Sequence, residues 1–269
     1  PLSSLTTPSP PLQVTPADLG NPAALYAKLG CKTVVGLPFK DISTTDTLLL
    51  RSVPAVDDAT ARQTIKRLQD VAIHMLVPAA ELEREPLEGA VALQTLDEAL
   101  TGSLPACAAR RVIALRGDET SEQVAKLKST DHAFIMLDVP PELSRIHASR
   151  RVFALLKEQQ IDSAVIHHWR PPPSDTSELA LQLGAQVGGL LCDGLGDGVL
   201  LEPQAGADFD LEMMRTTSFG LLQGSRMRST KTEFVSCPSC GRTLFDLQEV
   251  TAQISERTGH LPGVAIAIM

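Results

Sequence analysis

Short apolar runs alternate with amphipathic helical windows along most of this chain, and that alternation limits the folds open to it. Runs of strand length include TVVGL, VIAL, FIML and SAVI. Strands that alternate with helices indicate βα units and a largely parallel sheet, buried on both faces. About six or seven such units predict an α/β domain with a barrel-like βα repeat, with a doubly wound sheet as the alternative.

The residue pattern also places individual elements. The window 57–72 opens on two aspartates that suit a helix N-terminus and carries Ile65 and Leu68 at helical spacing. Expected strands are 32–36, 47–51, 90–94, 111–115, 133–138, 163–167 and 188–192. Expected helices are 57–72, 119–129, 141–159, 174–184 and 207–223, with a further one after residue 243.

Composition excludes several classes of function. The net charge of −8 over 269 residues argues against nucleic acid or an anionic membrane as the main partner. The sequence has no apolar run of the roughly 18 residues that a transmembrane helix needs. The five cysteines form an odd set in a chain of this size, which favours reduced thiols.

Four regions are expected. Residues 1–21 are rich in Pro, Ser and Thr and suggest a linker or disordered segment. The barrel-like domain should follow at 22–205, then a helix and basic connecting segment at 206–231, and a last α+β unit at 232–269. The chain begins without Met and ends on the strand-like run VAIAIM, so we expect a fragment of a longer protein.

The glycine-rich stretch GGLLCDGLGDGVLLEP (188–203) has two interpretations. A phosphate-cradling loop is one, but the spacing matches neither the dinucleotide fingerprint nor the P-loop with its lysine. We therefore favour a tight structural turn at a strand end.

The stretch FVSCPSCGRT (234–243) carries the clearest chemistry, the CxxC pair Cys237 and Cys240. A redox dithiol of the glutaredoxin kind needs further strands downstream, and only the 29 residues 241–269 follow. Structural zinc needs four ligands, and the sequence has no second CxxC. An iron–sulfur cluster also uses a close pair with distant partners, so the residues alone rank it equal to zinc.

A basic segment directly before this pair favours a metal site with an anionic substrate. Arg226, Arg228 and Lys231 lead into the cysteines, and arginine suits bidentate binding of phosphate. A solvated charged edge is the alternative interpretation.

These residues resemble a known family. The stretch LLQGSRMRSTKTEFVSCPSCGRTLFDLQEVTAQISERTGHLPGVAIAIM is similar to the C-terminal region of plastid-type 4-hydroxy-3-methylbut-2-enyl diphosphate synthases of the non-mevalonate isoprenoid pathway. Upstream, KTVVGLPFKDISTTDTLLLRSVPAVDDATARQTIKRL, SRIHASRRVFALL and DGLGDGVLLE resemble the domain that plant-type members insert between the catalytic barrel and the cluster domain. The resemblance covers residues 22–269.

The resemblance implies an oxidoreductase that reductively opens 2-C-methyl-D-erythritol 2,4-cyclodiphosphate. It implies a [4Fe-4S] cluster held by three cysteines and a glutamate, with Cys237 and Cys240 as the first two ligands. Ferredoxin would deliver the electrons in the plastid stroma, and bacterial relatives suggest a homodimer. The other two ligands and the catalytic barrel are expected outside this chain, so the chain alone should be inactive.

The resemblance also assigns the remaining candidates. Arg226, Arg228 and Ser229 match the family's segment that meets the substrate diphosphate. His167, His168, Asp118, Glu119, Asp193 and Asp197 lie at expected strand ends, where barrel enzymes place acid–base groups. Because the inserted domain is structural in the family, packing and hydrogen bonding are favoured for both histidines. The alternative for the whole chain is a non-enzymatic zinc-binding or scaffolding module that uses the CPSC pair.

Overall fold

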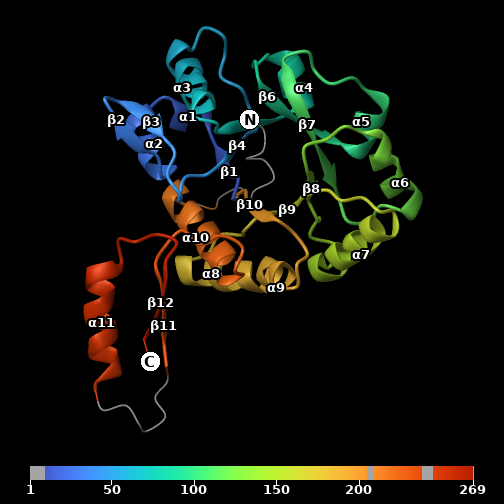
Figure 1. The fold of residues 1–269 in the computed structure, drawn as a ribbon. Coiled ribbons are helices and arrows are strands. Elements are labelled where there is room, and N and C mark those ends of the chain that lie inside the picture. The colour runs from blue at the N-terminus through green and yellow to red at the C-terminus, as the bar shows by residue number, and fades with distance from the viewer. Residues whose placement is uncertain (1–9, 205–206, 208, 238–244, 269) are drawn as a thin grey trace.

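The computed structural model describes residues 10–204, 207, 209–237 and 245–268. Eight parallel strands close into a barrel in the order β1-β10-β9-β8-β7-β6-β5-β4 (Figure 1). They are β1 Leu12–Val14, β4 Thr47–Leu50, β5 His74–Pro78, β6 Ala90–Thr95, β7 Ala108–Leu115, β8 Ile135–Leu137, β9 Val165–Trp169 and β10 Gly198–Leu201. The predicted barrel-like α/β domain is therefore confirmed.

Strand β1 closes the barrel. Leu12 pairs with Leu201 of β10 on one side and with Leu48 of β4 on the other. Without this three-residue strand, β4 and β10 would both present unpaired backbone groups at open edges.

Helices surround the barrel on its outer side (Figure 1). They are α1 Pro16–Leu19, α2 Pro22–Lys28, α3 Ala59–Asp70, α4 Ala79–Arg84, α5 Leu96–Thr101, α6 Ser121–Ala125, α7 Arg145–Glu158, α8 Thr176–Leu183, α9 Gly189–Cys192 and α10 Leu211–Gly224. A 3-10 turn, Lys126–Ser129, extends α6, and a π-helical turn, Gly184–Gly188, joins α8 to α9. As the acidic start of window 57–72 predicts, the Asp58 side chain accepts the N–H of Ala61 and caps α3.

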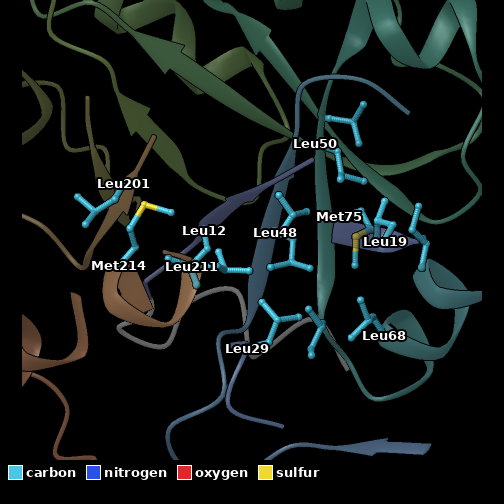
Figure 2. Close-up of a cluster of buried hydrophobic side chains, with 14 of the residues drawn as sticks. Leu12, Leu19, Leu29, Leu48, Leu50, Leu68, Met75, Leu201, Leu211 and Met214 are labelled. Atoms are coloured by element: carbon cyan, nitrogen blue, oxygen red, sulfur yellow. The ribbon is translucent and has the colours of Figure 1, made fainter. Parts of the chain in front are cut away.

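The core has two layers, because successive strand residues face opposite sides of the barrel wall. Leu49, Leu76, Val91, Ile166 and Leu200 fill the interior. The alternate residues pack outward against the helices. Figure 2 shows part of this outer layer, where Leu12 and Leu48 lie near Leu211 and Met214 of α10. Each such side chain contributes about 1.5–3 kcal/mol when fully buried.

A smaller unit follows the barrel. Strands β11 Glu233–Ser236 and β12 Ala265–Ile268 pair in parallel, and helix α11 Leu247–Thr258 connects them. The unit extends away from the barrel beyond α10 (Figure 1), and no residue of α11 within the described part is buried. The carboxylate of Asp246 caps α11 by accepting the N–H groups of Gln248 and Glu249.

Two expected strands have other places in the structure. The segment 32–36 contributes β2 Lys32–Val34, which pairs with β3 Leu37–Phe39 in an antiparallel hairpin outside the barrel. The expected strand 188–192 is wrong, since these residues form the end of the π-helical turn and α9. A short apolar run does not distinguish a buried strand from a buried helix. Here the segment packs closely against α10, since a Cβ at Gly188 would lie only 3.2 Å from the Leu221 side chain.

The structure also departs from the linker expected at 1–21. Residues 1–9 lie outside the described part, but β1 and α1 occupy 12–14 and 16–19. The Thr15 side chain accepts the N–H of Asp18, which makes a capping box from residues that composition alone assigns to a linker. Strand β5, with the sequence HMLVP, was not expected. Among the described helices, none is long and apolar enough to cross a bilayer.

Candidate functional site

The basic segment begins where α10 ends. Arg226 adopts a left-handed backbone conformation with φ of 61°, and its side chain is 77% exposed. Its Nη2 lies 3.5 Å from Glu233 Oε1 at the start of β11. Ser229 is also exposed. These two side chains are therefore open to solvent next to the smaller unit.

Arg228 has different surroundings, although it lies only two residues further on. Its Nη1 donates to Asp46 Oδ2 at 2.6 Å, and its Nη2 donates to the carbonyl of Ile42 at 3.1 Å. The guanidinium also stacks 5.1 Å from the ring centroid of Phe219 on α10. Arg228 thus attaches the basic segment to the barrel.

Asp46 directly precedes β4, at the N-terminal end of the barrel. It is buried and pairs with Lys40 as well as with Arg228. Burial alone would raise the pKa of Asp46, but the hydrogen bonds and charges of Lys40 and Arg228 lower it below its usual range. The carboxylate is therefore ionised at neutral pH and shared between two cations.

Cys237 lies directly after β11 and is half-buried. Its backbone N–H donates to the carbonyl of Ile268 at 3.0 Å, so the β11–β12 pairing fixes its position. Cys240 lies outside the described residues. A thiol held at a strand end suits a thiolate ligand of a metal centre.

No complete metal site is seen in the described part of the chain. There, no group of three or more His, Cys, Asp or Glu side chains could hold a metal ion. Cys237 as a metal ligand stays a prediction.

A second group of charged side chains converges at the C-terminal end of the barrel. It comprises five residues from the ends of four strands: Arg51, Asp138, His168, Arg170 and Glu202. The His168 ring is fully buried, with Nδ1 3.2 Å from Asp138 Oδ1 and Nε2 2.8 Å from Glu202 Oε2.

Two arginines complete this group. Arg51 donates from Nε and Nη2 to both oxygens of Glu202, each at 2.6 Å. Arg170 donates from Nη1 and Nη2 to Asp138 and from Nε to Glu202 at 3.0 Å. Burial would raise the pKa of both carboxyl groups, but His168 and the two arginines hold those pKa values far below the usual range. Each charge in the group has an opposite charge beside it.

His167 faces the other way from its neighbour. Its Nε2 donates to the carbonyl of Leu195 at 2.7 Å, and its ring lies 6.2 Å from that of Phe153 on α7. Burial lowers the pKa of His167 to about 4, so the ring is neutral at pH 7. The favoured interpretation of the two histidines as packing and hydrogen-bonding residues agrees with their complete burial.

The acidic candidates serve local structure. Glu119 accepts the N–H groups of Arg116 and Gly117, and Asp197 accepts the N–H of Val165 at 2.8 Å. Asp193 forms an exposed ion pair with Arg150 on α7.

Sequence reasoning missed most of the charged group at the barrel mouth. Its signal is a charged residue directly after an apolar strand, as in TLLLR, IMLD and GVLLE. Carboxyl ends of parallel strands meet at one end of a barrel, so these residues converge once the barrel closes.

Comparison with known proteins gives a consistent match. No family model matches the chain. It is 50% identical over 259 residues to the chloroplastic, ferredoxin-type 4-hydroxy-3-methylbut-2-en-1-yl diphosphate synthase of Arabidopsis thaliana, covering 94% of this chain and 34% of that protein. The rice protein of the same name is 50% identical over 266 residues, covering 96% of this chain and 35% of that protein.

A bacterial relative matches as well. The flavodoxin-type synthase of Protochlamydia amoebophila is 35% identical over 266 residues, covering 94% of this chain and 38% of that protein. The chain thus spans about a third of the length of these relatives. Among solved structures, tryptophan synthase of M. tuberculosis aligns at 14% identity and a TM-score of 0.47, with 84% of this chain and 96% of that chain covered. The assignment of the barrel rests on its own strand pairing.

Proposed function

We propose that this chain is a segment of a 4-hydroxy-3-methylbut-2-en-1-yl diphosphate synthase, an oxidoreductase of isoprenoid biosynthesis. The observation that carries the proposal is the 50% identity to the Arabidopsis and rice enzymes along at least 94% of the chain. In the whole enzyme, this segment supplies a closed βα barrel and part of the domain that follows it.

The proposed reaction is the reductive opening of 2-C-methyl-D-erythritol 2,4-cyclodiphosphate, with ferredoxin as electron donor in the plastid. When bound, a [4Fe-4S] cluster supplies the electrons and a Lewis-acidic iron. Cys237 and Cys240 would hold it as two of its ligands. The hydrogen bond from the N–H of Cys237 to Ile268 keeps the first of these thiols at the end of β11.

The proposed diphosphate contacts come from the segment after α10. Arg226 and Ser229 are exposed beside β11 and are the more accessible of the three candidates. Arg228 already donates to Asp46 and to the carbonyl of Ile42, and its side chain is 16% exposed, so it is the least accessible of the three. Through these contacts it holds the segment that carries Arg226 and Ser229 against the barrel.

A chimera tests the proposal. The corresponding third of the Arabidopsis enzyme is replaced by this chain, and the cyclodiphosphate is supplied with reduced ferredoxin under anaerobic conditions. We expect turnover and the absorption of a [4Fe-4S] cluster. Cys237→Ser and Cys240→Ser should each lose the cluster and the activity.

A matched control separates ligand loss from general damage. Cys192 is an exposed thiol at the end of α9, and Cys192→Ser should keep both cluster and turnover. Full iron content and activity in Cys237→Ser would refute the ligand assignment. Zinc retained stoichiometrically by the chimera, and lost in Cys240→Ser, would instead support the zinc-binding module.

A further inference from the structure

A cavity of about 700 Å³ opens at the C-terminal end of the barrel, beside the loops that follow β8 and β9. Its apolar lining residues include Trp169 and three prolines. Its polar lining residues are Ser144, Arg145, Arg170 and three glutamines. None of the lining residues that the structure describes is acidic, although the whole chain carries a net charge of −8.

Helix α7 points its N-terminus at this cavity. The helix has 14 residues and begins at Arg145, and its N-cap residue Ser144 makes no side-chain capping hydrogen bond. The first backbone N–H groups of a helix have no partner within the helix, and the helix dipole adds partial positive charge there. An uncapped helix start that lines a cavity favours an anion.

Arg145 gives a second, independent indication. Arg145 is among the residues that line the cavity, yet it is only 9% exposed. Nη2 donates to the carbonyl of Val139 at 3.3 Å, whereas Nη1 has no hydrogen-bond partner among the residues described. A buried donor nitrogen without a partner is costly even where the rest of the guanidinium is hydrogen-bonded, so the retention of Nη1 indicates an acceptor that binds there.

The charge on Arg145 persists at neutral pH. Burial lowers the pKa of its guanidinium to about 10, which leaves it protonated at pH 7. Arg170 lies at the rim, where its side chain is 39% exposed. Its donors are taken by Asp138 and Glu202, whose negative charges offset its own, so Arg145 and the start of α7 carry the site.

We propose that this cavity binds a small oxyanion, a phosphate or carboxylate group, on Arg145 and the N-terminus of α7. A guanidinium nitrogen and helix N–H groups are the donors that such oxygens accept from. The apolar lining residues, Trp169 among them, accommodate the organic part of the ligand. This site is separate from the basic segment and Cys237, and it does not depend on the function proposed above.

Ser144 provides a sharp test, because it is exposed and is the N-cap of α7. Asp and Asn are equally good N-caps, so Ser144→Asp and Ser144→Asn should both keep the fold. Only the aspartate places a negative charge at the mouth of the cavity. Isothermal titration calorimetry of the chain and both variants measures the affinity for inorganic phosphate, inorganic diphosphate and succinate.

We expect saturable binding of at least one of these anions to the unchanged chain. Ser144→Asn should bind it with similar affinity, and Ser144→Asp on the order of tenfold more weakly. Preference for phosphate or diphosphate over succinate identifies a phosphorylated ligand, and the reverse identifies a carboxylate. No saturation by any of the three at about 10 mM, or equal affinities in the two variants, overturns the proposal.

A second variant tests the role of Arg145 itself. Arg145→Met removes the buried charge and keeps most of the side-chain volume, so the melting temperature should hold or rise while anion binding is lost. Undiminished binding in a folded Arg145→Met protein would contradict the assignment. If this variant fails to fold, the Ser144 pair still decides the question.

Discussion

Arg228 and Asp46 form a close ion pair, 2.6 Å from Nη1 to Oδ2, although 182 residues separate them in the chain. The pair joins the segment that carries the proposed diphosphate contacts to the N-terminal end of β4. Lys40, just after the β2–β3 hairpin, shares the same carboxylate. One buried aspartate therefore fixes both the hairpin side and the C-terminal segment to the barrel.

Neutralising this aspartate should destabilise the protein. Asp46→Asn removes the negative charge that Lys40 and Arg228 share, and the side chains of these two cations are only 24% and 16% exposed. Removing one partner of such a pair costs about 3 kcal/mol of the free energy of unfolding. Urea unfolding at pH 7 measures the loss, and limited proteolysis between residues 224 and 232 should become faster.

A surface pair provides the control. Arg226 and Glu233 lie 3.5 Å apart with side chains 77% and 29% exposed, so Glu233→Gln should cost less than about 0.5 kcal/mol. Equal losses in the two variants would show that Asp46 has no special role in holding the segment.

His167 should make the protein less stable as the pH falls from about 6.5 to 4. Burial lowers its pKa in the folded protein to about 4, while the unfolded value is 6.5. Between these values the unfolded chain binds a proton that the folded protein does not, so the free energy of unfolding decreases on acidification, by up to about 3 kcal/mol. Urea midpoints measured across this range report the loss.

The matched variants for this prediction are both histidine-to-glutamine changes. His167→Gln keeps a donor for the carbonyl of Leu195 and should flatten the pH dependence between 6.5 and 4. His147→Gln, at an exposed position on helix α7, should leave it unchanged. A pH profile that is the same in all three proteins would rule out His167 as the source.

Two glycines with the same backbone conformation should respond differently to alanine. Gly30 has φ of 77° and Gly36 has φ of 74°. A Cβ at Gly30 would lie 2.6 Å from the carbonyl oxygen of Ser43, whereas a Cβ at Gly36 would meet nothing within 4 Å.

Gly36→Ala should therefore cost about 1–2 kcal/mol, the strain of a left-handed alanine. Gly30→Ala should cost about 2 kcal/mol more, because the backbone around Ser43 must shift. Thermal unfolding of both variants gives the comparison. A smaller loss at Gly30 than at Gly36 would contradict the close approach.

Much of the fold followed from periodicity, and the errors have physical causes. Helices α3 and α7 lie within the predicted windows 57–72 and 141–159. Both could be predicted because each carries apolar residues at helical spacing. Strand β1 could not be predicted from LQV in a Pro-rich segment, since its stability comes from pairing with β4 and β10 on closure of the barrel. The apolar pattern of 188–192 suits a strand or a helix equally, and only its packing against α10 distinguishes the two.

The candidate site was less accessible to sequence reasoning. Residues close in sequence, such as Arg226 and Arg228, were grouped together, although one is exposed and the other is bound to Asp46. The charged group at the barrel mouth combines residues as far apart as Arg51 and Glu202. Such convergence depends on strand order, which no local pattern contains.

The Glu202 carboxylate should stabilise the protein at neutral pH and lose that effect in acid. It accepts hydrogen bonds from Arg51 and Arg170, and His168 Nε2 lies 2.8 Å away. The pKa of Glu202 in the folded protein is far below the ordinary value. Its contribution to the free energy of unfolding is therefore present above about pH 4.3, the unfolded pKa, and decreases as the pH falls below that.

Glu202→Gln should thus lower the free energy of unfolding by about 3 kcal/mol at pH 7. At pH 3 the variant and the unchanged protein should differ by much less. Guanidinium unfolding at both pH values measures the two differences, and Glu122→Gln, at an exposed position on α6, serves as the control. An equal difference at pH 7 and pH 3 would mean that shape, and not the charge of Glu202, determines the effect.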